Sequence, residues 1–268
     1  MNFLKNDWNT KRQGNIPAPL FVSGGADNSS KASCQRLVTR CVVLVLLYSL
    51  CIDLPAQEIA DERDSVTISA NLDFVSQYIW RGQLYSNSPC IQPGFSVTWK
   101  DFELGAWGSY EFAGLGDHEA DFYLSKSIGF VAFEVWDYWC ISDTMSADFF
   151  DYHSETGNHL LEAQIILTGN ETLPLNLLGS YFFYGADSTN SLYLELQYQL
   201  SKGSTEVEAF AGYQARGSFY AEKPAFVNIG CTVTKTVHIT PTWEMPVSVS
   251  LIYNPDTKNI NLVAGITL

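Results

Sequence analysis

The side chains with the most evident chemistry in this sequence are carboxylates at alternate positions of polar–apolar segments. An ionised carboxylate is costly in lipid, so these groups must face water or a partner. Carboxylates that line a pore lower its barrier for cations and raise it for anions. The pattern predicts a β-barrel whose lumen prefers cations. The predicted lining residues are Asp73, Glu103, Glu111, Glu134, Glu162, Glu195, Glu206 and Glu208, with Arg81 and Lys100 as the few basic groups. The alternative is a lumen plugged by paired side chains, for instance Arg81 against Glu103 and Glu111.

The other reactive groups form no recognisable catalytic pattern. The sequence contains no Gly-x-Ser-x-Gly, His-Glu-x-x-His, P-loop or dinucleotide-binding motif. Its four histidines, at positions 118, 153, 159 and 238, stand outside any serine-rich catalytic context. We therefore predict a non-enzymatic protein without cofactor or catalytic metal. A lipid-modifying membrane enzyme remains an alternative.

An acidic segment over residues 142–157 allows several interpretations. It holds four carboxylates and a histidine, which could together bind a divalent cation: Asp143, Asp148, Asp151, Glu155 and His153. Their spacing matches no known calcium loop, which favours a solvated surface loop. A loop that folds into the lumen as a constriction is the third possibility.

The elements that position these groups have the period of β-strands. In residues 259–268, Ile260, Leu262 and Ile266 share one face, and polar or small residues occupy most of the other. About ten such residues cross a bilayer at a tilt. Twelve strands are predicted, over residues 66–84, 91–100, 102–112, 119–128, 131–141, 158–168, 173–185, 192–200, 205–215, 225–234, 238–253 and 259–268. Pro241 and Pro246 lie inside the eleventh, where we expect a bulge or a late start.

The connections between these strands alternate in length. Those after even-numbered strands are short, and those after odd-numbered strands are mostly longer, as in barrels with short periplasmic turns and long outer loops. An even number of strands places both ends of the barrel in the periplasm. A soluble β-sandwich would also alternate polar and apolar residues but would not need this rhythm. The predicted fold is an all-β, transmembrane, antiparallel up-and-down barrel of the bacterial outer membrane.

Aromatic residues gather near the predicted strand ends. Membrane barrels carry rings of aromatic side chains where lipid tails meet headgroups. We predict that such a girdle includes Tyr78, Trp80, Trp99, Tyr110, Trp139 and Tyr181.

Charge and hydropathy divide the chain near residue 56. Residues 1–56 hold six of the 15 Lys and Arg residues but only three of the 29 Asp and Glu residues. Arg36 and Arg40 precede a short apolar run that ends in Leu54-Pro-Ala56, which is typical of a secretory signal peptide. We expect a disordered extension or a mis-assigned start over 1–35, a signal peptide over 36–56, a periplasmic segment over 57–65 and the barrel over 66–268. The acidic body argues against nucleic-acid binding.

Three motifs early in the barrel resemble the TorF-like porin family of Gram-negative outer membranes. They are Asp73-Phe-Val-Ser-Gln-Tyr-Ile-Trp-Arg-Gly-Gln83, Ile91-Gln-Pro-Gly-Phe95 and Phe102-Glu-Leu-Gly-Ala-Trp-Gly-Ser109. Gly94 departs from the serine that is frequent in that family. The resemblance implies an outer-membrane barrel and leaves its substrate open.

These expectations define the predicted partners. The barrel would contact outer-membrane lipid and lipopolysaccharide, and its C-terminal strand would be recognised by the barrel-assembly machinery. Small solutes or cations would pass through the lumen. The alternative function is a plugged structural or adhesion barrel that does not conduct.

Overall fold

The computed structural model describes residues 65–113, 118–141, 148–153 and 156–268. The expected N-terminal extension (1–35), the signal peptide (36–56) and residues 57–64 of the periplasmic segment lie outside them. The described strands are β1 (Val66–Val75), β2 (Tyr78–Trp80), β3 (Gln83–Ser86), β4 (Cys90–Trp99), β5 (Phe102–Glu111), β6 (His118–Ile128), β7 (Val131–Ile141), β8 (His159–Leu167), β9 (Leu175–Gly185), β10 (Leu192–Lys202), β11 (Thr205–Arg216), β12 (Ala225–Thr240), β13 (Trp243–Asn254) and β14 (Asn259–Thr267).

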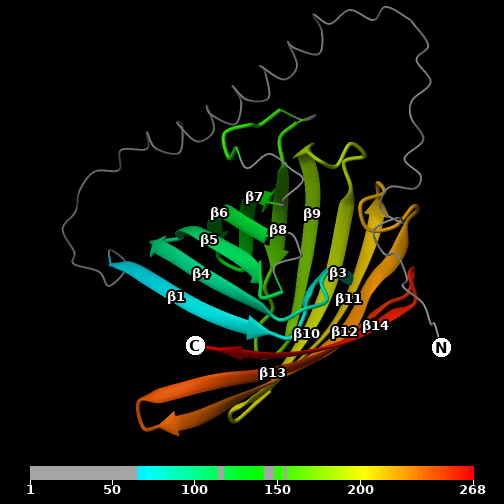
Figure 1. Ribbon diagram of the computed structural model, residues 1–268. Coiled ribbons are helices and arrows are strands. Elements are labelled where there is room, and N and C mark those ends of the chain that lie inside the picture. Colours follow the sequence, from blue (N-terminus) through cyan, green and yellow to red (C-terminus); the bar gives the residue numbers. More distant parts are fainter. Residues whose placement is uncertain (1–64, 114–117, 142–147, 154–155) are drawn as a thin grey trace, which may run out of the picture. The chain divides into compact units, whose positions relative to one another are not determined.

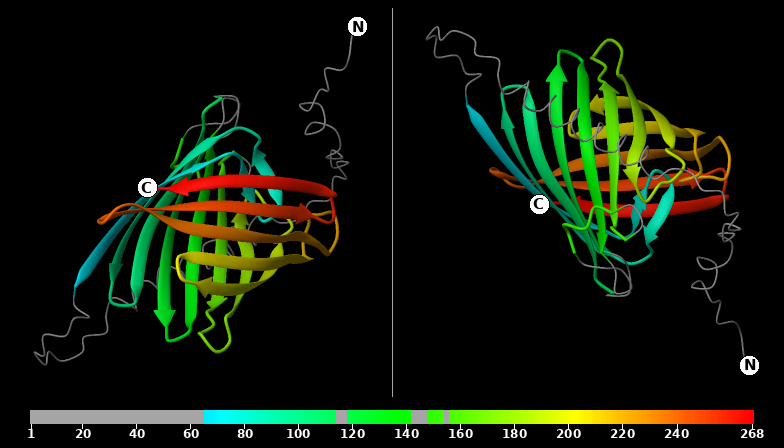
Figure 2. Two further views of the ribbon diagram at one scale, coloured as in Figure 1. Left: turned by 90° about the horizontal axis from the view of Figure 1, so that it is seen from below. Right: turned by 90° about the horizontal axis from the view of Figure 1, so that it is seen from above.

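Twelve of the described strands form a closed antiparallel barrel. Their order around the wall is β1, β14, β13, β12, β11, β10, β9, β8, β7, β6, β5 and β4, and Figures 1 and 2 show them in chain order from cyan to red. Closure pairs the backbone groups that an open sheet would leave free at its edges. The predicted twelve-stranded up-and-down barrel is therefore confirmed. The described part of the chain contains no helix long and apolar enough to cross a membrane.

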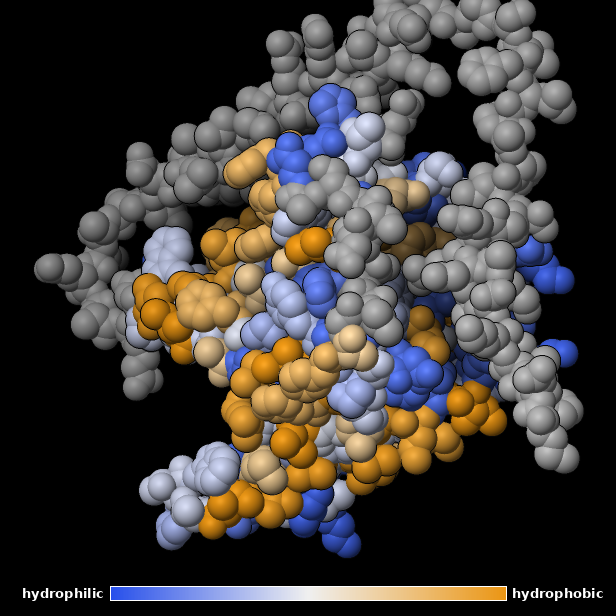
Figure 3. Space-filling model, in the orientation of Figure 1, coloured by the Kyte–Doolittle hydropathy of each residue, from blue (hydrophilic) through white to orange (hydrophobic). Residues whose placement is uncertain are grey.

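The wall of the barrel separates apolar from polar side chains. Large apolar residues such as Ile68, Leu104 and Leu262 are exposed on its outer face, and Figure 3 shows apolar side chains spread over the strands on the side in view. Residues that alternate with such outward residues point inward, and many of them are polar and buried, such as Gln164 and Ser180. A water-soluble barrel would bury its large apolar side chains in the interior. Apolar side chains on the outer face are typical of a barrel whose wall contacts lipid.

The connections differ between the two ends of the barrel. At one end of the barrel, two residues join β4 to β5, β6 to β7, β10 to β11 and β12 to β13. The seven residues that join β8 to β9 lie at the same end, which we call the short-turn end. Longer segments, such as 76–89 and 217–224, lie at the opposite, loop end. Val66 and Thr267 both lie at the short-turn end, because the barrel has an even number of antiparallel strands.

Two predicted strand ranges were wrong. The first strand does not run to residue 84: it ends at Val75, and residues 78–86 form a separate two-stranded sheet, β2–β3. The tenth strand does not end at residue 234, because β12 continues to Thr240 and turns at Pro241-Thr242. Proline lacks the N–H that a ladder needs, which places Pro241 in the turn. The late start expected for the eleventh strand is confirmed at Trp243.

A short seam closes the barrel. β1 and β14 are in register at three residue pairs, Asp73 with Thr267, Phe74 with Ile266 and Val75 with Gly265. On its other side β1 pairs with β4 over all ten of its residues. Reciprocal backbone hydrogen bonds between Leu72 and Leu268, at 3.1 and 3.0 Å, extend the seam by one step.

Candidate functional site

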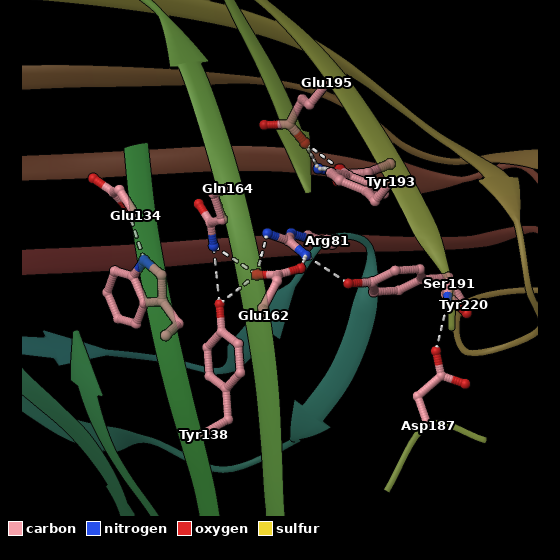
Figure 4. A network of polar contacts seen from close by, with 12 residues as sticks. Arg81, Glu134, Tyr138, Glu162, Gln164, Asp187, Ser191, Tyr193, Glu195 and Tyr220 are labelled. Carbon is pink, nitrogen blue, oxygen red and sulfur yellow. Dashed lines mark hydrogen bonds and ion pairs between the residues drawn. The ribbon is translucent and has the colours of Figure 1, made fainter. Parts of the chain in front are cut away.

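The β2–β3 hairpin folds into the lumen from the loop end. Its turn is Arg81-Gly82, with φ angles of 48° and 77°. Positive φ at both central residues is the geometry of the tight turns that suit twisted hairpins, and glycine adopts it without strain. The turn carries Arg81 to the inward face of β8, where the side chain is buried (Figure 4).

Arg81 binds Glu162 through both arms of its guanidinium. Nη1 donates to Oε1 at 2.5 Å, and Nη2 donates to Oε2 at 3.0 Å. Nη1 also donates to the Tyr220 hydroxyl at 2.6 Å. The guanidinium carbon lies 4.6 Å from the ring centre of Trp80 and 4.7 Å from that of Tyr193. A planar, weakly hydrated cation is thus held by a carboxylate at its edge and by aromatic faces.

Glu162 is fully buried, with 0% of its surface exposed, and has further donors from the barrel wall. The Tyr138 hydroxyl donates to its Oε2 at 2.7 Å, and Gln164 Nε2 donates to the same atom at 2.6 Å. A charged carboxylate survives burial when it is paired and its lone pairs accept hydrogen bonds. Glu162 meets both conditions.

The other side of the hairpin turn rests on the opposite wall. Asn254 Nδ2, on β13, donates to the Gly82 carbonyl at 3.1 Å. A methyl group added at Gly82 would lie 1.9 Å from the carbonyl oxygen of Val227 on β12. β8 and β13 are far apart around the ring, so the hairpin spans the lumen.

Gly82→Ala is expected to destabilise the barrel by more than the ~1–2 kcal/mol that a left-handed conformation costs other residues. The added methyl group must also push the hairpin away from Val227. Gly203→Ala is the matched control: Gly203 has φ of 62°, but nothing lies within 4 Å of the added methyl group. Urea unfolding of the barrel in lipid vesicles measures both costs. Equal costs would show that the hairpin does not press on the wall.

The loop between β11 and β12 also enters the lumen. Gln214, which is fully buried, accepts from the Tyr220 N–H at 2.7 Å and donates to the Ala221 carbonyl at 2.6 Å. These bonds present Tyr220 to Arg81. The hairpin and this loop complete an apolar cluster of Tyr138, Leu160, Phe182, Tyr193, Tyr220, Ala221 and Val227, against which Trp80, Trp136 and Phe219 pack. The loop-end half of the lumen is therefore filled by side chains.

The predicted lumen carboxylates all lie on barrel strands in the inward register. Most accept hydrogen bonds from neighbouring side chains: Glu103 from Thr98 and Tyr123, Glu111 from Ser86, Glu134 from Trp136, Glu195 from Tyr193, Gln197 and Asn228, Glu208 from Gln199, and Asp73 from Asn71 and Thr267. Glu206 and Glu208 share a pocket of about 210 Å³ near the short-turn end.

Three placements differ from the expectations for the lumen. Arg81 pairs with Glu162 and not with Glu103 or Glu111, because the hairpin turns its side chain toward β8. Lys100 sits in a short turn, with Nζ 4.7 Å from the ring centre of outward-facing Trp99, and so does not line the lumen. Glu119 and Asp121, which sequence reasoning missed, are buried and inward on β6. The alternation along 118–128 was the signal that would have found them.

The aromatic girdle is only partly where we expected it. Trp99, Tyr110 and Tyr181 occupy outward positions near strand ends. Trp139 is outward too, and Phe149 covers it at a ring distance of 5.1 Å. Tyr78 and Trp80 lie inside the barrel: Tyr78 packs on Trp107 and Trp80 on the buried cluster, because both belong to the hairpin.

The described part of the acidic loop packs against the outer wall and not in the lumen. Phe149 contacts the outward residues Phe122 and His159, and the Tyr152 hydroxyl donates to Asp137 at 2.6 Å. Asp143 and Glu155 lie outside the described residues. Among the residues that are described, no group of three or more His, Cys, Asp or Glu side chains could hold a metal ion.

Comparison with known proteins gives a family but no chemistry. No curated protein matches the chain. A solved structure, "KdgM porin", is similar to it with a TM-score of 0.45 and 10% sequence identity, over 75% of this chain and 98% of that one. The family model described as "Bacterial protein of unknown function (Gcw_chp)" matches residues 59–260. The TorF-like resemblance stays a prediction. Because the Gcw_chp family model covers most of the sequence, the chain belongs to the Gcw_chp family of bacterial proteins.

Proposed function

We propose that the protein is a porin-like channel of the bacterial outer membrane, with both ends of the barrel in the periplasm and a lumen that prefers cations. The observation that carries the proposal is the closed twelve-stranded wall, apolar outside and lined with carboxylates inside. In this proposal lipid and lipopolysaccharide contact the outer wall, and the assembly machinery recognises β14. The proposed activity is passive passage of small solutes or ions, without enzymatic chemistry.

The charge of the inward face supports cation preference. The eight predicted carboxylates outnumber the basic side chains on this face, and Arg81 offsets only its partner Glu162. Fields from charges in a narrow, low-dielectric passage concentrate ions of opposite sign. Glu206 and Glu208 are well placed to act on ions that enter from the short-turn end.

Glu206→Gln with Glu208→Gln is expected to lower the cation-to-anion permeability ratio, since it removes two negative charges from the lumen pocket. Reversal potentials in planar bilayers under a KCl gradient measure the ratio. Asp256→Asn, in the exposed turn between β13 and β14, is the matched control and should change it little. An anion-selective reversal potential of the unaltered protein would refute the charge argument.

A plugged structural barrel is the second candidate, and the filled loop-end half of the lumen favours it. The two functions differ in conductance. A barrel that is folded, as judged by heat-modifiable gel mobility, yet carries no current at any applied voltage would support the plugged barrel and overturn the channel. A protein that stays soluble without detergent would overturn both.

A further inference from the structure

We infer that the wall pocket that holds Arg81 is a recognition site for a guanidinium group, and that a solute carrying this group competes with Arg81 for it. The protein's own hairpin would then be a tethered occupant of a solute site. Binding at the site stands on the geometry alone. Only the consequence, that displacement of the hairpin widens the lumen, rests on the proposed channel function.

The site has the features that a guanidinium ligand requires. Glu162 presents two oxygens to two nitrogens of Arg81, at 2.5 and 3.0 Å, which is the bidentate pairing that distinguishes guanidinium from ammonium. Tyr220 accepts a third hydrogen bond, and the face of Tyr193 covers the cation. These three contacts come from the wall of the barrel or from the β11–β12 loop. The face of Trp80, 4.6 Å from the cation, belongs to the hairpin and would leave with it.

The wall groups are held in place without the help of Arg81. Tyr138 and Gln164 both bond to Glu162, and Gln164 Nε2 lies 3.1 Å from the Tyr138 hydroxyl. Tyr193 donates to Glu195, and Asn228 donates to both residues. Figure 4 shows Tyr138 and Gln164 bonded to Glu162, and Glu162 and Tyr220 bonded to the Arg81 side chain. A pocket fixed in this way keeps its shape when the occupant leaves, so an incoming cation pays little for ordering it.

The hairpin lies outside the ring of strands that closes the barrel, so its displacement would break no strand pairing of the ring. β2 and β3 pair with each other and form a sheet separate from the closed ring. Apart from Arg81, its polar contacts with the rest of the lumen include Gln83 to the Tyr220 carbonyl at 2.7 Å and Asn254 to the Gly82 carbonyl at 3.1 Å. Because a tethered group has a high effective concentration, a free solute competes poorly with the intact hairpin and binds best when the Arg81 side chain is removed.

The test uses the full barrel of Arg81→Ala, folded in detergent, with ethylguanidinium chloride as the probe. Binding is followed by tryptophan fluorescence and by the thermal midpoint. We expect saturable binding to this variant, at least about tenfold tighter than to the unaltered protein because the competing side chain is gone. Ethylurea, which has a similar shape but no charge, should bind at least about tenfold more weakly than ethylguanidinium. Adding Glu162→Gln to Arg81→Ala should abolish the difference between the two probes.

Lys126→Ala is the matched control, because it removes a cation that pairs with Asp101 at 3.1 Å and lies over the Phe102 ring, but at an exposed site on the outside. It should bind the probe no better than the unaltered protein does. If Arg81→Ala does not fold, Arg81→Lys is the second variant. It keeps a positive charge beside Glu162 but cannot form the two parallel hydrogen bonds of a guanidinium. Ethylguanidinium should still bind this variant more tightly than ethylurea does. Equal affinities for the two probes, or no saturable binding to a folded variant, would overturn the site.

Conductance separates this inference from the proposed function. Block or enhancement of current by ethylguanidinium in Arg81→Ala would support both. Probe binding in a barrel that never conducts would support the guanidinium site and overturn the proposed channel function. Conduction by a folded Arg81→Ala barrel that does not bind the probe would support the proposed channel function and overturn the guanidinium site.

Discussion

Glu162→Ala is expected to lower the free energy of unfolding by about 3–5 kcal/mol, because it leaves the Arg81 guanidinium buried without its counter-charge. Burial decides the size of the effect: Glu162 has 0% and Arg81 9% of its surface exposed. Tyr138 and Gln164 would also lose the acceptor that they share. Urea-dependent unfolding from lipid vesicles measures the loss.

Asp101→Ala provides the matched control for that prediction. It removes the acidic partner of the exposed pair with Lys126 and should cost less than ~1 kcal/mol. The double replacement Arg81→Leu with Glu162→Leu should recover much of the loss, since no uncompensated charge remains. If Glu162→Ala costs no more than Asp101→Ala, Arg81 and Glu162 do not form a buried pair.

Leu196→Arg is expected to impair folding into lipid by about 2–4 kcal/mol, the cost of a basic residue on the lipid face near the middle of the bilayer. Leu196 lies near the middle of β10, faces outward and has 47% of its surface exposed. Folding yield and urea unfolding in vesicles of defined thickness give the cost.

The adjacent residue supplies the control for the lipid-face prediction. Gln197 faces the lumen, and its Nε2 donates to Glu195 at 2.9 Å, so Gln197→Arg places a cation beside a carboxylate. This change should be tolerated far better than Leu196→Arg. If the two substitutions cost the same, the outer surface is in contact with water and the membrane assignment fails.

The ring of strands was predictable because each strand carries its own signal. The alternation along β10, from Leu192 to Leu200, determines which side chains face outward without reference to any other strand. Gly129 and Gly203, with φ of 61° and 62°, mark two of the short turns in the same local way. Register between sequence neighbours then follows from the short connections that join them, and closure pairs the two strands that remain at the edges of the sheet, β1 and β14.

The occupied lumen was not predictable, because its contacts are not local. Tyr78 and Trp80 continue the period of β1 into the hairpin, so the pattern does not show where the wall ends. Gly82 was the available local sign, since a glycine inside a strand pattern can mark a turn. The partner of Arg81 is 81 residues away in the chain. Such a pairing depends on how far each inward side chain reaches across the barrel, which no periodicity encodes.

The brevity of the β1–β14 seam has a consequence for biogenesis. Thr267 bonds to Asp73 across 194 residues of sequence, so the ring can close only after β14 has been synthesised. Contacts between such distant segments form slowly, because most of the chain must be ordered first. Until then β1 and β14 both present unpaired backbone, and a chain that lacks residues 266–268 would lose two of the three register pairs that complete the circle.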